Sequence, residues 1–182
     1  MSNKQNIKDL IRQQYTSCAT DPIFFMKQYC YIQHPKRGKI KFNLYDFQET
    51  SLSELKDSRY SVILKSRQLG ISTLTAGYAL WCMLFKEDFN TLVIATTQEI
   101  AKNLVTKVRI MHDNLPSWLK GNIEADNKLS LKFKNGSQIK AVSSATTGAR
   151  SEALSLLIVD EAAFIRNVEE IWIASQATLS TG

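Results

Sequence analysis

The sequence predicts an α/β protein in which helices flank a mainly parallel central sheet. Three short apolar runs carry this prediction: one begins residues 60–73, and the others are residues 91–97 and 155–159. Each run leads into polar residues, which is typical of a strand buried on both faces whose C-terminal end carries a site. Helical patterns follow the first two runs, and alternation of strands with helices indicates right-handed crossovers and a parallel sheet.

The composition fits a single folded domain. The chain has 182 residues, of which 44% are hydrophobic and 22% are charged, so a sizeable core is expected and a disordered chain is not. The formal net charge of +6 favours an anionic partner, although a generically basic surface explains it equally well. No apolar run approaches the roughly 20 residues that span a bilayer, so no membrane partner is expected.

Three cysteines, Cys18, Cys30 and Cys82, are spread widely along the chain. They form no CxxC motif, and the only imidazoles are those of His34 and His112, so no zinc site is predicted. An odd number of cysteines without a signal peptide fits a reducing cytoplasm and buried free thiols.

Residues 1–43 are expected to form a helical N-terminal extension that becomes irregular toward its end. Asp21 followed by Pro22 predicts a helix start, because an aspartate side chain caps free N–H groups and proline suits the first helical turn. Residues 34–41, HPKRGKIK, hold four lysines and arginines around Gly38 and predict a basic hairpin or loop. This segment could contact a phosphate backbone, and a solvated turn is at least as good an interpretation.

The later elements follow from periodicity and turn chemistry. Helices are predicted over residues 74–85, 98–114 and 168–179, where apolar residues recur at helical spacing. Residues 128–143 alternate between apolar and polar side chains on both sides of Asn135-Gly136, which is the strongest short signal for an antiparallel hairpin. The predicted sheet therefore carries an antiparallel hairpin beside its parallel strands.

Residues 65–72, KSRQLGIS, separate the first predicted strand from a helix and resemble a phosphate-binding loop. In such a loop, backbone N–H groups and the helix N-terminus hold phosphate oxygens, while a hydroxyl completes a Mg²⁺ shell. Against GxxxxGK[ST] the segment keeps Gly70 and Ser72, but Lys65 replaces the first glycine and Ile71 replaces the lysine. Lys65, Arg67 or both would therefore have to reach back over the loop to the phosphates. The alternative is a glycine turn between a core strand and a core helix.

Two adjacent carboxylates, Asp160 and Glu161, follow the predicted strand at residues 155–159. In a nucleotide hydrolase, the first acid at such a strand end holds the Mg²⁺ water shell and the second polarises the attacking water. A solvated pair after an edge strand is the alternative. The phosphate-loop pattern upstream favours the hydrolase interpretation.

Taken together, KSRQLGIST at residues 65–73 and LLIVDEAAF at residues 156–164 resemble the ATPase domain of the large terminase subunit, the DNA-packaging motor of tailed bacteriophages. The resemblance covers about residues 45–182. It implies a P-loop NTPase fold, ATP and Mg²⁺ as cofactors, and an ATPase core over residues 44–182.

The resemblance also implies roles for single residues. Ser72 and Asp160 would hold Mg²⁺, and Glu161 would activate water. Gln48 would contact adenine, with Tyr45 or Phe47 packing on the ring, although this stretch also reads as a helix N-terminus capped by Asp46. The phosphate-binding residues would be Lys65, Ser66, Arg67, Gln68, Leu69, Gly70, Ile71, Ser72 and Thr73.

The polar segment at residues 143–152, SSATTGARSE, contains a single arginine, Arg150. A guanidinium at the γ-phosphate would stabilise the charge that develops in the transition state, and the terminase resemblance implies an arginine finger in the loop before the acidic strand. Arg150 is therefore the predicted finger. A salt bridge with Glu152 and simple solvation are the alternatives.

Double-stranded DNA, a portal protein, a small terminase subunit and a homo-oligomeric ring are the partners that the resemblance implies, in the cytoplasm of an infected bacterium. It further implies that another strand and a nuclease domain follow in complete relatives, so the chain is expected to be an N-terminal fragment. Two other functions stay open: a helicase-like nucleic-acid-dependent ATPase, and a non-catalytic nucleotide-binding assembly module. Ile71 in the lysine position favours the module.

Overall fold

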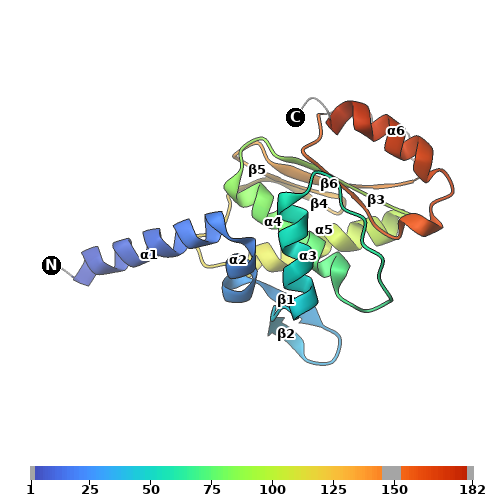
Figure 1. Ribbon diagram of the computed structural model, residues 1–182. Coiled ribbons are helices and arrows are strands. Elements are labelled where there is room, and N and C mark those ends of the chain that lie inside the picture. Colours follow the sequence, from blue (N-terminus) through green and yellow to red (C-terminus); the bar gives the residue numbers. More distant parts are fainter. Residues whose placement is uncertain (1–2, 145–152, 180–182) are drawn as a thin grey trace.

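The computed structural model describes residues 3–144 and 153–179 of the chain. Its main feature is a five-stranded mixed sheet with the strand order β4-β5-β6-β3-β7, accompanied by a separate β1-β2 hairpin (Figure 1). The strands are β1 (Tyr31–His34), β2 (Gly38–Lys41), β3 (Asn90–Ala95), β4 (Ile123–Asn127), β5 (Ser130–Phe133), β6 (Gln138–Ser143) and β7 (Leu156–Val159). The helices are α1 (Asn3–Thr20), α2 (Pro22–Tyr29), α3 (Asp46–Asp57), α4 (Ile71–Phe85), α5 (Gln98–Asp113), α6 (Val168–Leu179) and the short 3-10 turn η2 (Ala162–Phe164).

The central strand β3 runs parallel to both of its neighbours, β6 and β7. The other two pairings, β5 with β6 and β4 with β5, are antiparallel. The hairpin predicted around Asn135-Gly136 is therefore confirmed as β5-β6, and its return strand β6 is itself part of the parallel sheet. The predicted α/β class is confirmed as well.

Side chains of β3 point alternately into two cores, one on each face of the sheet. Val93 and Ala95 belong to the main core, which also contains the buried faces of α4 and α5. Leu92 and Ile94 belong to a smaller core that packs beside α6. The sheet is therefore a middle layer, with α4 and α5 on one face and α6 on the other (Figure 1).

The N-terminal segment contributes to the same main core. Phe25, Met26 and Phe42 are buried in it together with residues of α4 and α5. The helix start predicted at Asp21 is confirmed, because the Asp21 carboxylate accepts a hydrogen bond of 2.8 Å from the Ile23 N–H. The basic segment forms the predicted hairpin, β1-β2. The domain division at residue 43 stays a prediction.

The three thiols are buried, as the sequence predicts. Burial raises the pKa of Cys18 to about 12, with a smaller contribution from the negative charge of Asp21. Burial also raises the pKa of Cys82 to about 11 and that of Cys30 further. All three thiols therefore stay protonated at neutral pH. Among the described residues, no helix has the length and apolar character that a membrane span requires.

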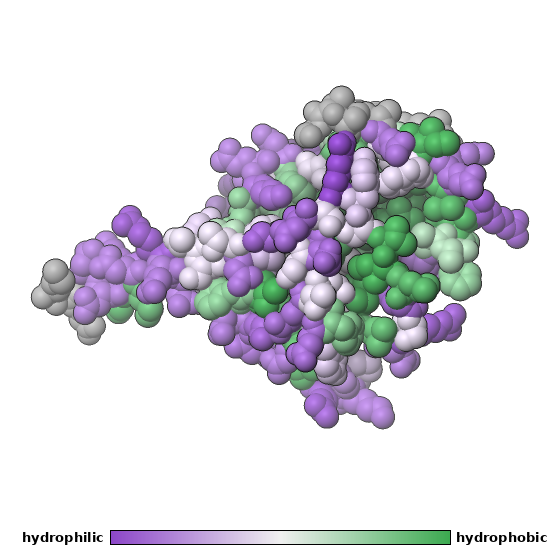
Figure 2. All heavy atoms as spheres, in the orientation of Figure 1, coloured by the Kyte–Doolittle hydropathy of each residue, from purple (hydrophilic) through white to green (hydrophobic). Residues whose placement is uncertain are grey.

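The strand predicted at the start of residues 60–73 is wrong. Residues 61–66 have no regular secondary structure, and Val62 and Leu64 are 99% and 101% exposed. A strand needs a neighbour to take its backbone hydrogen bonds, and within the described residues β7 pairs only with β3. In Figure 2 apolar colour gathers over the part of the face where Figure 1 draws the α3–α4 connection.

Two further strands differ from the sequence-based expectation. β7 is half-buried along its length rather than enclosed on both faces, because it lies at an edge of the sheet. β4 was not predicted, because its sequence IEADN is polar and all five residues are exposed. Both cases show an edge strand whose pattern departs from that of a central one.

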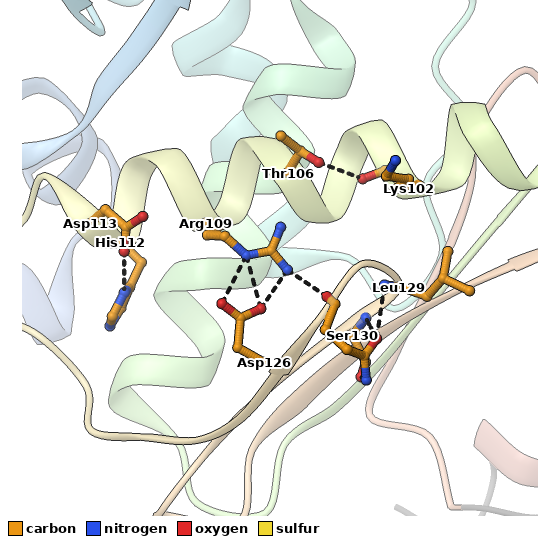
Figure 3. Close-up of polar contacts among 9 residues, drawn as sticks. Lys102, Thr106, Arg109, His112, Asp113, Asp126, Leu129 and Ser130 are labelled. Atoms are coloured by element: carbon orange, nitrogen blue, oxygen red, sulfur yellow. Dashed lines mark hydrogen bonds and ion pairs between the residues drawn. The ribbon is translucent and has the colours of Figure 1, made fainter.

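The edge strand β4 is attached to α5 by an arginine. Arg109 donates three hydrogen bonds to the Asp126 carboxylate (Figure 3): from Nε to Oδ1 at 2.9 Å and to Oδ2 at 3.1 Å, and from Nη2 to Oδ1 at 2.6 Å. Arg109 Nη2 also donates to the Asn127 carbonyl at 2.7 Å. The Asn127 side chain then accepts hydrogen bonds from the Leu129 and Ser130 N–H groups, which closes the turn into β5. One guanidinium thus joins α5 to the β4-β5 turn.

We predict that Arg109→Met lowers the free energy of unfolding by about 1–3 kcal/mol, since it leaves Asp126 and a backbone carbonyl without their charged partner. Lys132→Met is the matched control, because it removes the more exposed 3.0 Å ion pair with Glu124 on the same strand pair. The control should cost less than about 0.5 kcal/mol. Urea unfolding measures both, and equal losses would contradict the role given to Arg109.

Candidate functional site

The candidate phosphate loop, residues 65–72, lies between the irregular segment and the N-terminus of α4. Its backbone is left-handed at two places, Gln68 with φ 64° and Gly70 with φ 73°. A left-handed conformation costs a residue with a side chain about 1–2 kcal/mol, so the turn at Gln68 is maintained against its local preference. Left-handed residues in a turn direct successive N–H groups toward one side, the geometry of an anion-binding nest.

The start of α4 leaves backbone donors free. The Gly70 carbonyl accepts hydrogen bonds from the N–H groups of Thr73 at 3.0 Å and Leu74 at 2.9 Å. The N–H groups of Ile71 and Ser72 precede these and have no partner within the helix, as in the first turn of any helix. Together with the positive end of the helix dipole, they can hold an anion.

The cations of the loop lie before the glycine. Lys65 and Arg67 are exposed, and neither forms an ion pair with another residue in the described part of the chain. Ile71, at the position where the motif has its lysine, is only 6% exposed and packs in the main core. The positive charge of this loop therefore comes from Lys65 and Arg67.

Gln48 connects the loop to α3. Its side-chain Nε2 donates a 2.9 Å hydrogen bond to the Leu69 carbonyl, and its Oε1 accepts a 3.1 Å bond from the Tyr45 N–H. The side chain is only 2% exposed. Tyr45, not Asp46, occupies the N-cap position of α3, so the alternative of a cap by Asp46 is wrong. Sequence reasoning selected Gln48 but missed its bond to the loop.

Tyr45 and Phe47 form an exposed aromatic pair beside Gln48. Their rings are nearly parallel, with an interplanar angle of 8° and centroids 5.7 Å apart. Tyr45 is 68% exposed and Phe47 is 42% exposed. Aromatic surface of these two rings is therefore available to a ligand, whereas the Gln48 side chain is buried.

The two acids lie at the carboxyl end of β7. The Asp160 N–H donates a 2.9 Å hydrogen bond to the Ile94 carbonyl, so Asp160 lies next to the end of β3 as well. Its side chain is half-buried and accepts a 3.0 Å hydrogen bond from the Glu161 N–H. Glu161 is exposed and left-handed, with φ 55°. Ligands of parallel α/β sheets bind at this edge.

The structure brings some of the predicted residues together. Gln48 contacts Leu69 and lies against Gly70, and Ser72 and Thr73 lie half-buried in the first turn of α4. Figure 1 draws the α3–α4 connection and the turn after β7 on the same side of the molecule. The Tyr60 and Trp172 rings, 5.3 Å apart, connect the segment before the loop to α6. The predicted finger, Arg150, lies outside the described residues.

The oxygen donors of the site suit Mg²⁺. This ion prefers hard oxygen ligands, retains several waters and is commonly bound by one or two protein oxygens together with phosphate. The Ser72 hydroxyl and the Asp160 carboxylate are donors of that type, and neither position offers a competing sulfur or imidazole. The assignment of Ser72 and Asp160 as metal ligands stays a prediction that this chemistry fits.

The central strands of the sheet are parallel, and two acids lie at their carboxyl edge. A left-handed glycine turn opens a buried helix. Together these features define an α/β protein of the ATPase-domain type. Residues 62–182 match the family model described as "Terminase large subunit, T4likevirus-type, N-terminal". The chain therefore belongs to the family of terminase large subunits.

A solved structure supports the same fold. The large terminase of bacteriophage HK97 aligns with this chain at a TM-score of 0.68 and 19% sequence identity. The alignment covers 87% of this chain and 35% of the HK97 protein, so the chain spans about a third of that terminase. At this identity the likeness concerns the fold.

Proposed function

We propose that this chain is the ATP-hydrolysing core of a DNA-packaging motor. One observation carries the proposal: within a chain of the terminase family, a left-handed loop with two exposed cations leads into the free N–H groups of α4. The adjacent acids at the end of β7 support hydrolysis rather than binding alone. ATP with Mg²⁺ is the proposed substrate.

The proposed role of each site residue follows from its chemistry. Lys65 and Arg67 offset the charge of the β- and γ-phosphates, while the N–H groups at the start of α4 bind phosphate oxygens. Glu161 orients the attacking water and takes up its proton. Ser72 and Asp160 would hold Mg²⁺, which when bound neutralises charge on the phosphate oxygens.

A second function, nucleotide binding without catalysis, is favoured by one observation. Ile71 fills the position of the motif lysine and is packed in the core, so no side chain from that position reaches a phosphate. A loop of this kind could bind a nucleotide for assembly only. Nucleotide binding without turnover would select this function.

The proposed partners follow from the family. The motor moves double-stranded DNA into a prohead through a portal protein, with a small terminase subunit and a homo-oligomeric ring of large subunits, in the cytoplasm of an infected bacterium. A ring would allow Arg150 of one subunit to act at the site of its neighbour.

We predict that Glu161→Gln lowers the rate of Mg²⁺-dependent ATP turnover at least about 100-fold while nucleotide binding persists, because the variant keeps the side-chain shape but loses the proton acceptor. Glu169→Gln, an exposed acid in the first turn of α6, is the control and should turn over like the wild type. Phosphate release and fluorescent-nucleotide binding measure the two quantities. Wild-type turnover in Glu161→Gln would remove Glu161 from the mechanism.

Binding to double-stranded DNA should be independent of sequence and strongly dependent on salt. A packaging motor must move any sequence, so its contacts are expected to be with DNA phosphates. The excess of lysine and arginine behind the net charge of +6 would supply the cations for these contacts. We expect the affinity to fall by at least about tenfold between about 50 and about 200 mM salt. Fluorescence anisotropy with two unrelated duplexes measures this, and a strong preference for one duplex would contradict it.

A further inference from the structure

The β1-β2 hairpin concentrates positive charge. Residues 34–41 contain four of the 23 lysines and arginines of the chain and none of its 17 aspartates and glutamates. The four cations are Lys36, Arg37, Lys39 and Lys41, and all four are exposed. In the part of the chain that the structure describes, none of them forms an ion pair with a carboxylate. Their charge is therefore available to a ligand.

The hairpin has an inner apolar face and an outer basic face. Side chains of a strand alternate between the two faces, and directly paired residues share one. Ile32 is paired with Ile40 on the inner face, where both are half-buried and Ile32 packs against the main core. Gln33 is paired with Lys39 on the outer face, and both are exposed. Lys41 follows Lys39 on the same face, about 7 Å further along the strand.

Lys39 is held in position without losing its charge. Its ammonium group donates a 2.9 Å hydrogen bond to the Asn114 side-chain oxygen and lies 5.5 Å from the centre of the Tyr31 ring. Both partners are neutral, and an ammonium group has three N–H donors, so donors remain for an anion. A side chain that is already positioned loses less conformational entropy when it binds a ligand.

The framework of the hairpin is fixed at its base and at its tip. The Phe42 N–H donates a 3.0 Å hydrogen bond to the Cys30 carbonyl, and both side chains are buried in the main core. At the tip, His34 Nδ1 accepts hydrogen bonds from the N–H groups of Lys36 at 3.1 Å and Arg37 at 3.2 Å. Figure 1 draws the hairpin at the lower edge of the molecule, and Figure 2 shows hydrophilic colour there.

The chemistry of the outer face and the turn fits a polyanion. A membrane-binding segment presents apolar side chains to the lipid, and the centre of a protein interface is poor in charge and rich in aromatic side chains. Here Gln33 and Pro35 are exposed among the cations, while Tyr31 is half-buried with the Lys39 ammonium over its ring. Lysine and arginine contacts with the phosphates of a duplex carry no sequence information, which suits a motor that moves any sequence.

We propose that the outer face and the turn of the β1-β2 hairpin bind the phosphates of double-stranded DNA. This inference rests on the proposed packaging function and assigns its DNA contacts to one surface. Each phosphate contact contributes about −0.9 to the slope of log affinity against log salt concentration. Four contacts from the hairpin therefore give a slope of about −3.6.

The test compares two double variants that remove the same charge. Lys36→Gln/Arg37→Gln neutralises the hairpin turn, and Lys128→Gln/Lys134→Gln, the control, neutralises two exposed cations in the turns on either side of β5. Fluorescence anisotropy with a labelled duplex and no nucleotide, at several salt concentrations, measures affinity and slope. At about 100 mM salt the hairpin variant should bind at least about tenfold more weakly, with a slope smaller in magnitude by about 2. The control should stay within about threefold of the wild type.

Two further measurements keep the test decisive. Urea unfolding should give both double variants the midpoint of the wild type, because all four substituted side chains are exposed. Should the hairpin variant unfold more easily, Lys41→Gln removes one cation from the strand instead of the turn. This single variant should reduce the magnitude of the slope by about 1.

The outcomes separate this inference from the proposed function. If the wild type binds the duplex and the hairpin variant binds it equally well, the inference is wrong and the packaging function stands. Equal weakening in the hairpin variant and the control would assign binding to net charge and would also overturn the inference. A hairpin variant that loses affinity for poly-glutamate but not for DNA would indicate an acidic protein partner instead. Failure of the wild type to bind any duplex at about 50 mM salt would overturn both the inference and the proposed DNA partner, whereas ATP turnover tests the ATPase separately.

Discussion

The central strand β3 is the constraint on which the rest of the structure depends. Its backbone is paired on both edges, with β6 and β7, and its side chains are buried on both faces. Val93 and Ala95 hold α4 and α5 on one side, while Leu92 and Ile94 hold α6 on the other. Because β7 is bonded to β3 in register, Asp160 is carried to the carboxyl edge of the sheet, beside Ile94.

The candidate phosphate loop is positioned differently, by side chains rather than by the sheet. The segment before it has no strand partner among the described residues, and Val62 and Leu64 are exposed. What holds the loop is the buried start of α4 after it and the hydrogen bond from Gln48 to Leu69. A loop held mainly at one end and by one amide should depend strongly on that amide.

Much of the fold could be predicted from local patterns. The β5-β6 hairpin follows from alternation and from Asn135-Gly136, and the start of α2 follows from Asp21. The strand predicted before the loop was wrong. An apolar run indicates burial, whereas a strand also requires a neighbouring strand that local sequence does not reveal. The edge strand β4 was missed for the opposite reason, since pairing with β5 and an arginine from α5 stabilise a polar sequence.

The candidate site, like the fold, could be predicted from the sequence only in part. Its residue types were recognisable because phosphate loops and paired acids have characteristic spacings, and the predictions for Gly70, Ser72, Asp160 and Glu161 rest on those spacings. The bond between Gln48 and Leu69 joins residues 21 positions apart, and the packing of the amide against Gly70 is a matter of tertiary structure. No spacing rule predicts that Gln48 is buried and hydrogen-bonded to the loop.

The central claim is that the backbone entering α4 binds the triphosphate, and amide hydrogen exchange tests it most directly. Exchange should be followed for the loop and for α4 in the wild-type chain, with and without Mg²⁺ and a non-hydrolysable ATP analogue. The account predicts slower exchange at Gly70, Ile71 and Ser72 when the nucleotide is present, because their N–H groups would bind phosphate oxygens. Nucleotide binding that leaves exchange at these three residues unchanged would contradict the claim.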